Sequence, residues 1–290
     1  METEQLYQTY KPLLFSLAYQ MLGSVMDAED IVHDTFLAFD EHKKKEAIQN
    51  EKAFLCRMVT NRTIDKLRSS VQKRNVYIGT WLPEPLVEDI NNPSESYLMK
   101  ESISNAYLLL LQQLTETERS VFLLREVFQY DYDEIAAIVE KSAVNCRQIF
   151  HRSRKSMETR PNTDKTDFSK MKEYVEQFVG ALQRADIGAM LASLKTDAVY
   201  KSDGGGKVKA ALKPIHTAER IVRLLLGVMT KLPKGASFEY QIVNGGPGII
   251  ALINNRVSYV VSFEFEEEKI DSIYMIANPD KLVHLNNGRM

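Results

Sequence analysis

Amide, guanidinium and imidazole side chains are concentrated between residues 145 and 155. The set consists of Asn145, Arg147, Gln148, His151, Arg152, Arg154 and Lys155. No acidic residue interrupts it. Amides and guanidinium groups can hydrogen-bond the edges of bases, and cationic groups bind phosphates. These residue types therefore point to a nucleic-acid contact, although a helical hairpin with a solvated basic face would have the same composition.

Two short helices joined by a tight turn are predicted to present this set. Asp131 and Glu134 have the spacing of a capping box, which predicts the start of the first helix. Ser142 can cap the second helix. Its packing stripe would consist of Cys146, Ile149, Phe150, Ser153 and Met157. The pattern is a helix-turn-helix whose second helix is the recognition helix, although Glu140 stands in the turn where glycine is common.

A helical pattern also runs from Leu6 to about Arg74, with breaks only at Gly23 and at residues 41–50. One helix, residues 27–39, has an acidic outer face and an apolar inner face. The next helix, from residue 54 to about 75, is strongly basic, which suits a phosphate backbone. A basic helix of this kind is also commonly a solvated surface.

Composition sets limits on the class of protein. The chain has 290 residues and a formal net charge of -2, so binding to nucleic acid depends on local basic faces. It has no apolar run of bilayer-spanning length and no signal-peptide pattern, which predicts a cytoplasmic protein without a membrane partner. Cys56 and Cys146 fall on predicted helices, so we expect buried thiols and neither a disulfide, a metal site nor a cofactor.

The predicted domain order is helical, linker, helical and then mixed. Residues 1–76 form the first all-α domain, and residues 77–93 form a proline-rich linker that contains the only tryptophan, Trp81. Residues 94–160 form a second all-α domain, with a capping box at Thr115 and Glu118. Its core candidates are Leu108, Leu111, Leu114, Val121, Phe122 and Leu124.

Three blocks in this order resemble regions 2 and 4 of the extracytoplasmic-function (ECF) sigma factors of bacterial RNA polymerase. The blocks read DAEDIVHDTFLAF, FLCRMVTNRTIDKLR and LTETERSVFLLREVFQYDYDEIAAIVEKSAVNCRQIFHRSRK. Several blocks in one order are more specific than a single helix-turn-helix. The resemblance implies that the partners are core RNA polymerase, through its β′ clamp helices and β flap, and promoter DNA.

Residue roles follow from this resemblance alone. It assigns Asp30, Asp34 and Phe36 to the polymerase contact. It assigns Asn61, Arg62, Asp65 and Arg68 to the −10 element. The −35 element would be bound by Asn145, Arg147, Gln148, His151, Arg152 and Arg154.

Residues 165–290 have a different pattern, with helices followed by strands. Helices are predicted at residues 167–185 and from residue 217 to about 229, and strands at 237–243, 248–252, 257–265 and 270–276. This α+β order resembles the SnoaL-like, NTF2-type cone, in which a curved sheet surrounds helices and leaves a pocket. The predicted fold is therefore multidomain, with two all-α sigma domains followed by an α+β cone.

Three short motifs resemble signatures of ECF sigma factors with a fused SnoaL-like domain, the SigJ-like group. The motif residues are Trp81, Leu82, Pro83, Glu84 and Pro85; Asp203, Gly204, Gly205, Gly206 and Lys207; and Asn278, Pro279, Asp280 and Lys281. The resemblance implies that the C-terminal domain regulates the sigma domains through contacts made by these motifs. The three glycines also allow positive φ and close backbone approach, as in any tight turn.

Two other functions fit parts of the sequence. The cone could be an enzyme with Asp203 as a base, although no His/Asp pair or metal-ligand spacing supports this. The chain could instead be a ligand-responsive repressor that binds an unidentified small molecule in the cone. A simple repressor has no use for the block at residues 27–75, which favours the sigma factor.

Overall fold

The computed structural model describes residues 3–41, 48, 50–74, 77–88, 103–157 and 168–287. The chain divides into two compact units. The first contains Met1–Val76, Glu95–Lys100 and Tyr107–Arg160, and the second contains Tyr77–Ser94, Glu101–Ala106 and Pro161–Met290. The domain boundaries predicted at residues 93–94 and 160–165, and the predicted helix ends at Asn75 and Asp167, lie outside the described residues.

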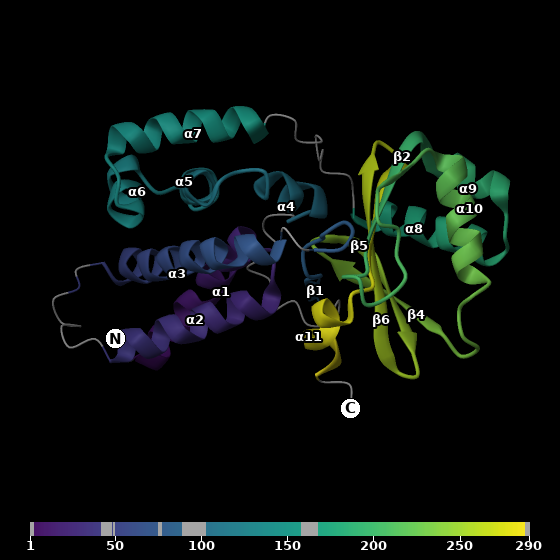
Figure 1. The fold of residues 1–290 in the computed structure, drawn as a ribbon, viewed down its shortest axis with the longest axis horizontal. Helices are drawn as coiled ribbons and strands as arrows, with labels where there is room; N and C mark the ends of the chain where they lie inside the picture. The colour runs from purple at the N-terminus through teal and green to yellow at the C-terminus, as the bar shows by residue number, and fades with distance from the viewer. Residues whose placement is uncertain are drawn as a thin grey trace. The chain divides into compact units, whose positions relative to one another are not determined.

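The first unit is helical, as predicted. Its helices are α1 (Thr3–Leu22), α2 (Val25–Asp40), α3 (Glu51–Arg74), α4 (Asn105–Leu111), α5 (Glu116–Glu126), α6 (Tyr132–Val139) and α7 (Ala143–Met157). The first two residues of α4 belong to the second unit. Figure 1 shows α5 and α6 between α7 and α3. All six predicted core residues of the second helical domain are buried, at 6% exposure or less.

Local sequence explains where these helices begin. Capping boxes form at Thr115 with Glu118 and at Asp131 with Glu134, which confirms both predictions. The Ser24 hydroxyl accepts a hydrogen bond from the Asp27 amide at 3.1 Å and so caps α2. Each cap satisfies an amide that the helix itself leaves without a partner.

The second unit is a mixed sheet with helices. The helical elements are α8 (Phe168–Gln183), α9 (Ile187–Ser193), α10 (Ala218–Met229), the 3₁₀ helix η4 (Pro279–Leu282) and α11 (Val283–Asn286). The strands are β1 (Val87–Glu88), β2 (Leu194–Asp203), β3 (Ile215–His216), β4 (Ser237–Val243), β5 (Gly246–Ile253), β6 (Arg256–Glu266) and β7 (Lys269–Ile276). Figure 1 shows α8, α9 and α10 on one side of this sheet.

The strand order is β1-β4-β5-β6-β7-β2-β3. Strands β4 to β7 form the predicted antiparallel meander, and β2 pairs in parallel with β7. The predictions omitted β1, β2 and β3. Buried side chains of α8 and α10, such as Phe178 and Ile221, pack with the inner face of the sheet to form the core.

Candidate nucleic-acid interface and supporting contacts

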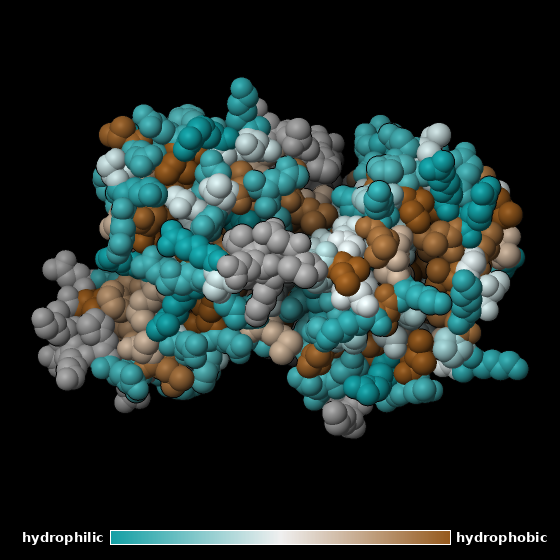
Figure 2. Space-filling model, in the orientation of Figure 1, coloured by the Kyte–Doolittle hydropathy of each residue, from teal (hydrophilic) through white to brown (hydrophobic). Residues whose placement is uncertain are grey.

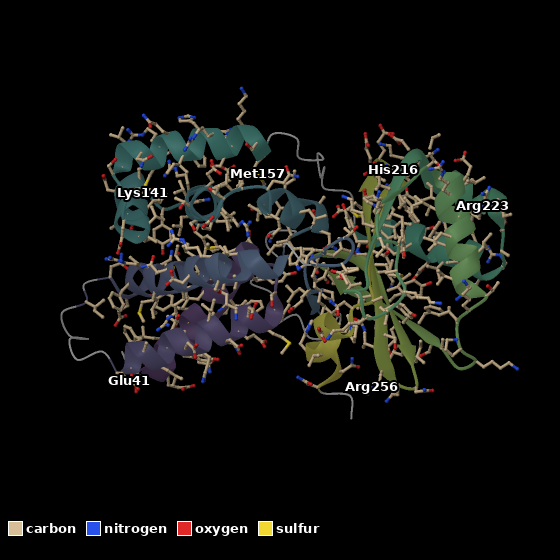
Figure 3. All side chains as sticks on the ribbon, in the orientation of Figure 1. Glu41, Lys141, Met157, His216, Arg223 and Arg256 are labelled. Atoms are coloured by element: carbon tan, nitrogen blue, oxygen red, sulfur yellow. The ribbon has the colours of Figure 1, made fainter. Side chains whose placement is uncertain are left out.

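Helix α7 has one buried face and one polar face. Its buried residues are Cys146, Ile149, Phe150, Ser153 and Met157, which is the predicted packing stripe. The predicted −35 residues and Lys155 are all exposed. The surface over α7 is mainly hydrophilic in Figure 2, and Figure 3 shows nitrogen-tipped side chains along its outer side, with Lys141 and Met157 labelled near its ends. The helix therefore presents amide and cationic groups as a recognition helix would.

The turn before α7 keeps helix-turn-helix geometry without glycine. Glu140 ends α6 in the left-handed region, with φ 54° and ψ 48°. Its carboxylate forms an ion pair with Arg57 of α3, at 2.7 Å between Nη2 and Oε1. The left-handed conformation costs a non-glycine residue on the order of 1 kcal/mol. The exposed ion pair offsets only part of this cost.

Replacing Glu140 with glycine is therefore expected to give a more stable protein than replacing it with alanine, by about 1 kcal/mol. Both changes remove the ion pair with Arg57, so the comparison isolates the backbone conformation. Urea denaturation of the two variants measures the difference. An alanine variant as stable as the glycine variant would show that residue 140 is not left-handed.

The ring of Tyr132, at the first position of α6, contacts two guanidinium groups. The guanidinium carbons of Arg125 and Arg147 lie 4.8 and 4.9 Å from the centre of its ring. Such stacking stabilises a cation and limits its motion. Tyr132 therefore holds Arg147 in place, a role that the sequence did not reveal because Tyr132 looked like an ordinary residue of the helix cap.

The predicted polymerase-contact residues on α2 differ in exposure. Asp30 and Asp34 are exposed, whereas Phe36 is 5% exposed and its ring packs edge-on against Tyr7 at 4.9 Å between centroids. Phe36 therefore supports α2 from inside the unit. The exposed carboxylates are the groups that are accessible to a partner.

The predicted −10 residues lie along α3. Asn61 and Arg62 are partly buried, and Asp65 and Arg68 are exposed. Arg68 lies near two carboxylates, 4.0 Å from Asp65 and 3.6 Å from Glu116 of α5. A phosphate contact by Arg68 would therefore replace a contact that joins α3 to α5.

Both cysteines are buried and free, as predicted. Burial raises the pKa of the Cys56 thiol to about 11, and the Tyr130 hydroxyl donates to its sulfur at 3.1 Å. Burial also raises the pKa of Cys146. A thiol with a raised pKa is a poor nucleophile and a poor metal ligand, so both cysteines are packing residues. In the described part of the chain, no group of His, Cys, Asp and Glu side chains could hold a metal ion.

A second polar cluster is centred on Asp203, which is 0% exposed. Its carboxylate accepts hydrogen bonds from the Leu82 amide at 2.8 Å, from the Gly205 amide at 3.0 Å and from the Tyr77 hydroxyl. It also forms an ion pair with Lys281 at 2.7 Å. The Lys281 ammonium in turn donates to the Leu82 carbonyl. Asp203 thus joins all three motifs within the second unit.

The glycines allow this close approach. Gly205 and Gly206 have φ of 58° and 71°. A Cβ on Gly205 would come within 2.3 Å of the Asn278 amide nitrogen, and a Cβ on Gly206 within 2.9 Å of Ile78. Glycine is therefore required both for the backbone conformation and for the contacts with the other segments.

The segment predicted as a linker is built into the second unit over residues 77–88. Leu82 is completely buried, and Trp81 lies with its ring centre 4.1 Å from the Lys281 ammonium. After Pro85, β1 pairs with β4, with Val87 opposite Val243. The buried apolar anchor of the segment is therefore Leu82, and Trp81 stacks on a cation.

The cone contains an apolar cavity of about 90 Å³. Its lining includes Phe178, Leu225, Ile249, Phe263 and Met275, and Gln183 and Tyr259 are the lining residues with polar side-chain atoms. Asp203 does not line it. Asp203 is enclosed by its hydrogen-bond donors and lies outside the lining of this cavity.

No helix of the described residues is long and apolar enough to cross a membrane.

Comparison with known proteins agrees with this architecture. The family profile for sigma-70 region 2 matches residues 6–73, and that for sigma-70 region 4 matches residues 104–157. The chain is 28% identical over 288 residues to the ECF RNA polymerase sigma factor SigJ of Mycobacterium tuberculosis, covering 95% of this chain and 91% of that protein. It is 23% identical over 278 residues to the probable ECF sigma factor SigI of the same species, covering 95% and 93%.

The chain is also similar to the crystal structure of Mycobacterium tuberculosis SigJ. The match covers 96% of this chain and 98% of the SigJ chain, with 26% sequence identity and a TM-score of 0.78. This similarity spans the helical unit and the α+β unit together. The chain therefore carries sigma-70 regions 2 and 4 and is similar over nearly its whole length to an ECF sigma factor.

Proposed function

We propose that this protein binds core RNA polymerase and directs it to specific promoters. The observation that carries the proposal is the exposed polar face of α7, which lies opposite a fully buried stripe in a segment that matches sigma-70 region 4. The same chain carries a region 2 match with exposed carboxylates on α2 and a basic α3. A promoter-selecting factor needs both regions.

Full-length protein added to core RNA polymerase is expected to produce run-off transcripts of defined length from promoter fragments, whereas core polymerase alone produces none. The templates are fragments selected by the reconstituted enzyme from a randomised pool. Gel filtration of the mixture measures the association with core polymerase. Failure of both association and specific initiation would overturn the proposed function.

The C-terminal unit is proposed to modulate this activity through the chain between the two regions. Region 2 ends near Arg74 and region 4 begins near Ser104. Between them, residues 77–88 are held by Asp203, Lys281 and β4, and the Asn105 side chain donates to Ser262 at 2.6 Å. Because both ends of the connection are anchored to the second unit, this unit would set how far the two DNA-binding regions can separate.

We further propose that the C-terminal unit is not an enzyme. The support is that Asp203 is enclosed by its four donors and that the cavity has an apolar lining. A small-molecule ligand in the cavity stays a prediction, and its lining would favour an uncharged, apolar compound.

A further inference from the structure

The polar face of α7 has a centre and two flanks. Successive residues of an α-helix are rotated by about 100°. By this rotation Val144, Gln148, His151 and Lys155 follow one line along the helix, directly opposite the middle of the buried stripe. Arg147 and Arg154 lie to one side of this line, and Asn145 and Arg152 lie to the other.

Val144 stands at the start of the central line, in the first turn of α7, and is 62% exposed. It is the only large apolar side chain exposed on α7, all of whose residues are described. An exposed valine side chain contributes little hydrophobic stabilisation to the fold. Valine is β-branched, so its helix propensity is also lower than that of alanine. The fold therefore gives no reason for valine at this position.

Recognition of DNA does give a reason. The N-terminal residues of a recognition helix contact base edges in the major groove, where thymine differs from cytosine partly by its C5-methyl group. An apolar side chain is the complement of this methyl group. On a helix that lies in the major groove, residues on the two flanks would face the walls of the groove, where phosphates lie. The stack of Arg147 on Tyr132, at 4.9 Å, holds one such cation on its flank.

We propose that Val144 is a specificity-determining residue that contacts the C5-methyl group of a thymine in the −35 element. In this arrangement Gln148 and His151 face the neighbouring bases, and Arg147 and Arg152 bind phosphates on either side. The inference rests on the proposed function, because it requires that α7 enters the major groove of a promoter.

The test uses full-length protein with core RNA polymerase and a promoter selected from a pool randomised in the −35 element. Each thymine of that element is replaced singly by deoxyuridine, which removes only the methyl group. At one position the replacement is expected to weaken promoter binding by about fourfold, the value of one buried methyl-sized group. Val144→Ala should weaken binding to the thymine promoter by a similar factor and show no further loss with deoxyuridine at that position.

Two matched variants sharpen the result. Val144→Thr keeps one methyl group and should retain sensitivity to deoxyuridine, and Arg147→Ala should weaken binding and lower its salt dependence while retaining that sensitivity. Selection of a −35 element without thymine, or equal sensitivity to deoxyuridine in wild type and Val144→Ala, would overturn the inference while leaving the proposed function intact. Failure of wild type to select any promoter or to initiate transcription would overturn both.

Discussion

Replacing Asp203 with alanine is expected to destabilise the C-terminal unit by about 3–5 kcal/mol, the cost of removing one partner of a buried ion pair. The change leaves the Lys281 ammonium, whose side chain is 8% exposed, without its carboxylate. It also leaves the buried amide of Leu82 and the hydroxyl of Tyr77 without their acceptor. Urea denaturation followed by the emission of Trp81, the only tryptophan in the chain, measures the loss.

The matched control is Lys207→Ala. Lys207 and Asp280 form an ion pair between the same two motifs at 2.6 Å, but their side chains are 54% and 63% exposed. Because water screens this pair, its loss should cost about 0–1 kcal/mol. The double variant Asp203→Ala/Lys281→Met should recover part of the stability of Asp203→Ala, since it no longer buries an unpaired charge. Equal losses in Asp203→Ala and Lys207→Ala would show that burial does not distinguish the two pairs.

In the second unit, sequence periodicity predicted α8, α10 and the meander of β4 to β7, but not α9, η4 or α11. The packing stripe of α7 follows from apolar residues that recur at the helical period. The start of α6 follows from the three-residue spacing of its capping box. The residues predicted as strand 237–243 are those of β4.

The elements that the sequence did not predict depend on distant partners. Strand β1 has only two residues and exists because its backbone pairs with the edge of β4. Strand β2 contains the polar stretch Lys195–Asp197 and pairs in parallel with β7, far along the chain. Neither has a strong local pattern, and strand propensity depends on the neighbouring strands.

The resemblance identifies the three motifs but not how their charges pair. The structure joins Asp203 to Lys281 and Lys207 to Asp280. No local rule selects between partners that are more than 70 residues apart. Likewise, Tyr132 holds Arg147 through tertiary stacking that helix spacing does not show.

Glu264 on β6 is expected to make the stability of the C-terminal unit dependent on pH. Its carboxylate accepts a hydrogen bond from the Ala106 amide at 3.3 Å, in the first turn of α4. Burial raises its pKa from 4.5 to about 7, and the nearby charge of Asp271 adds to this effect. The folded unit therefore binds this proton more tightly than the unfolded chain does. The contribution of the protonated Glu264 carboxyl to the free energy of unfolding is complete below about pH 4.5 and is lost as the pH rises through about 7.

The free energy of unfolding should accordingly fall by at most about 3 kcal/mol between pH 5 and 8 through this group. In Glu264→Gln, which cannot ionise, this part of the pH dependence should disappear. Glu266→Gln is the control on the same strand. Because the Glu266 side chain is 64% exposed, this substitution should leave the dependence of stability on pH nearly unchanged. Urea denaturation at a series of pH values, followed by Trp81 emission, gives the slopes. Parallel curves for wild type and Glu264→Gln would contradict the prediction.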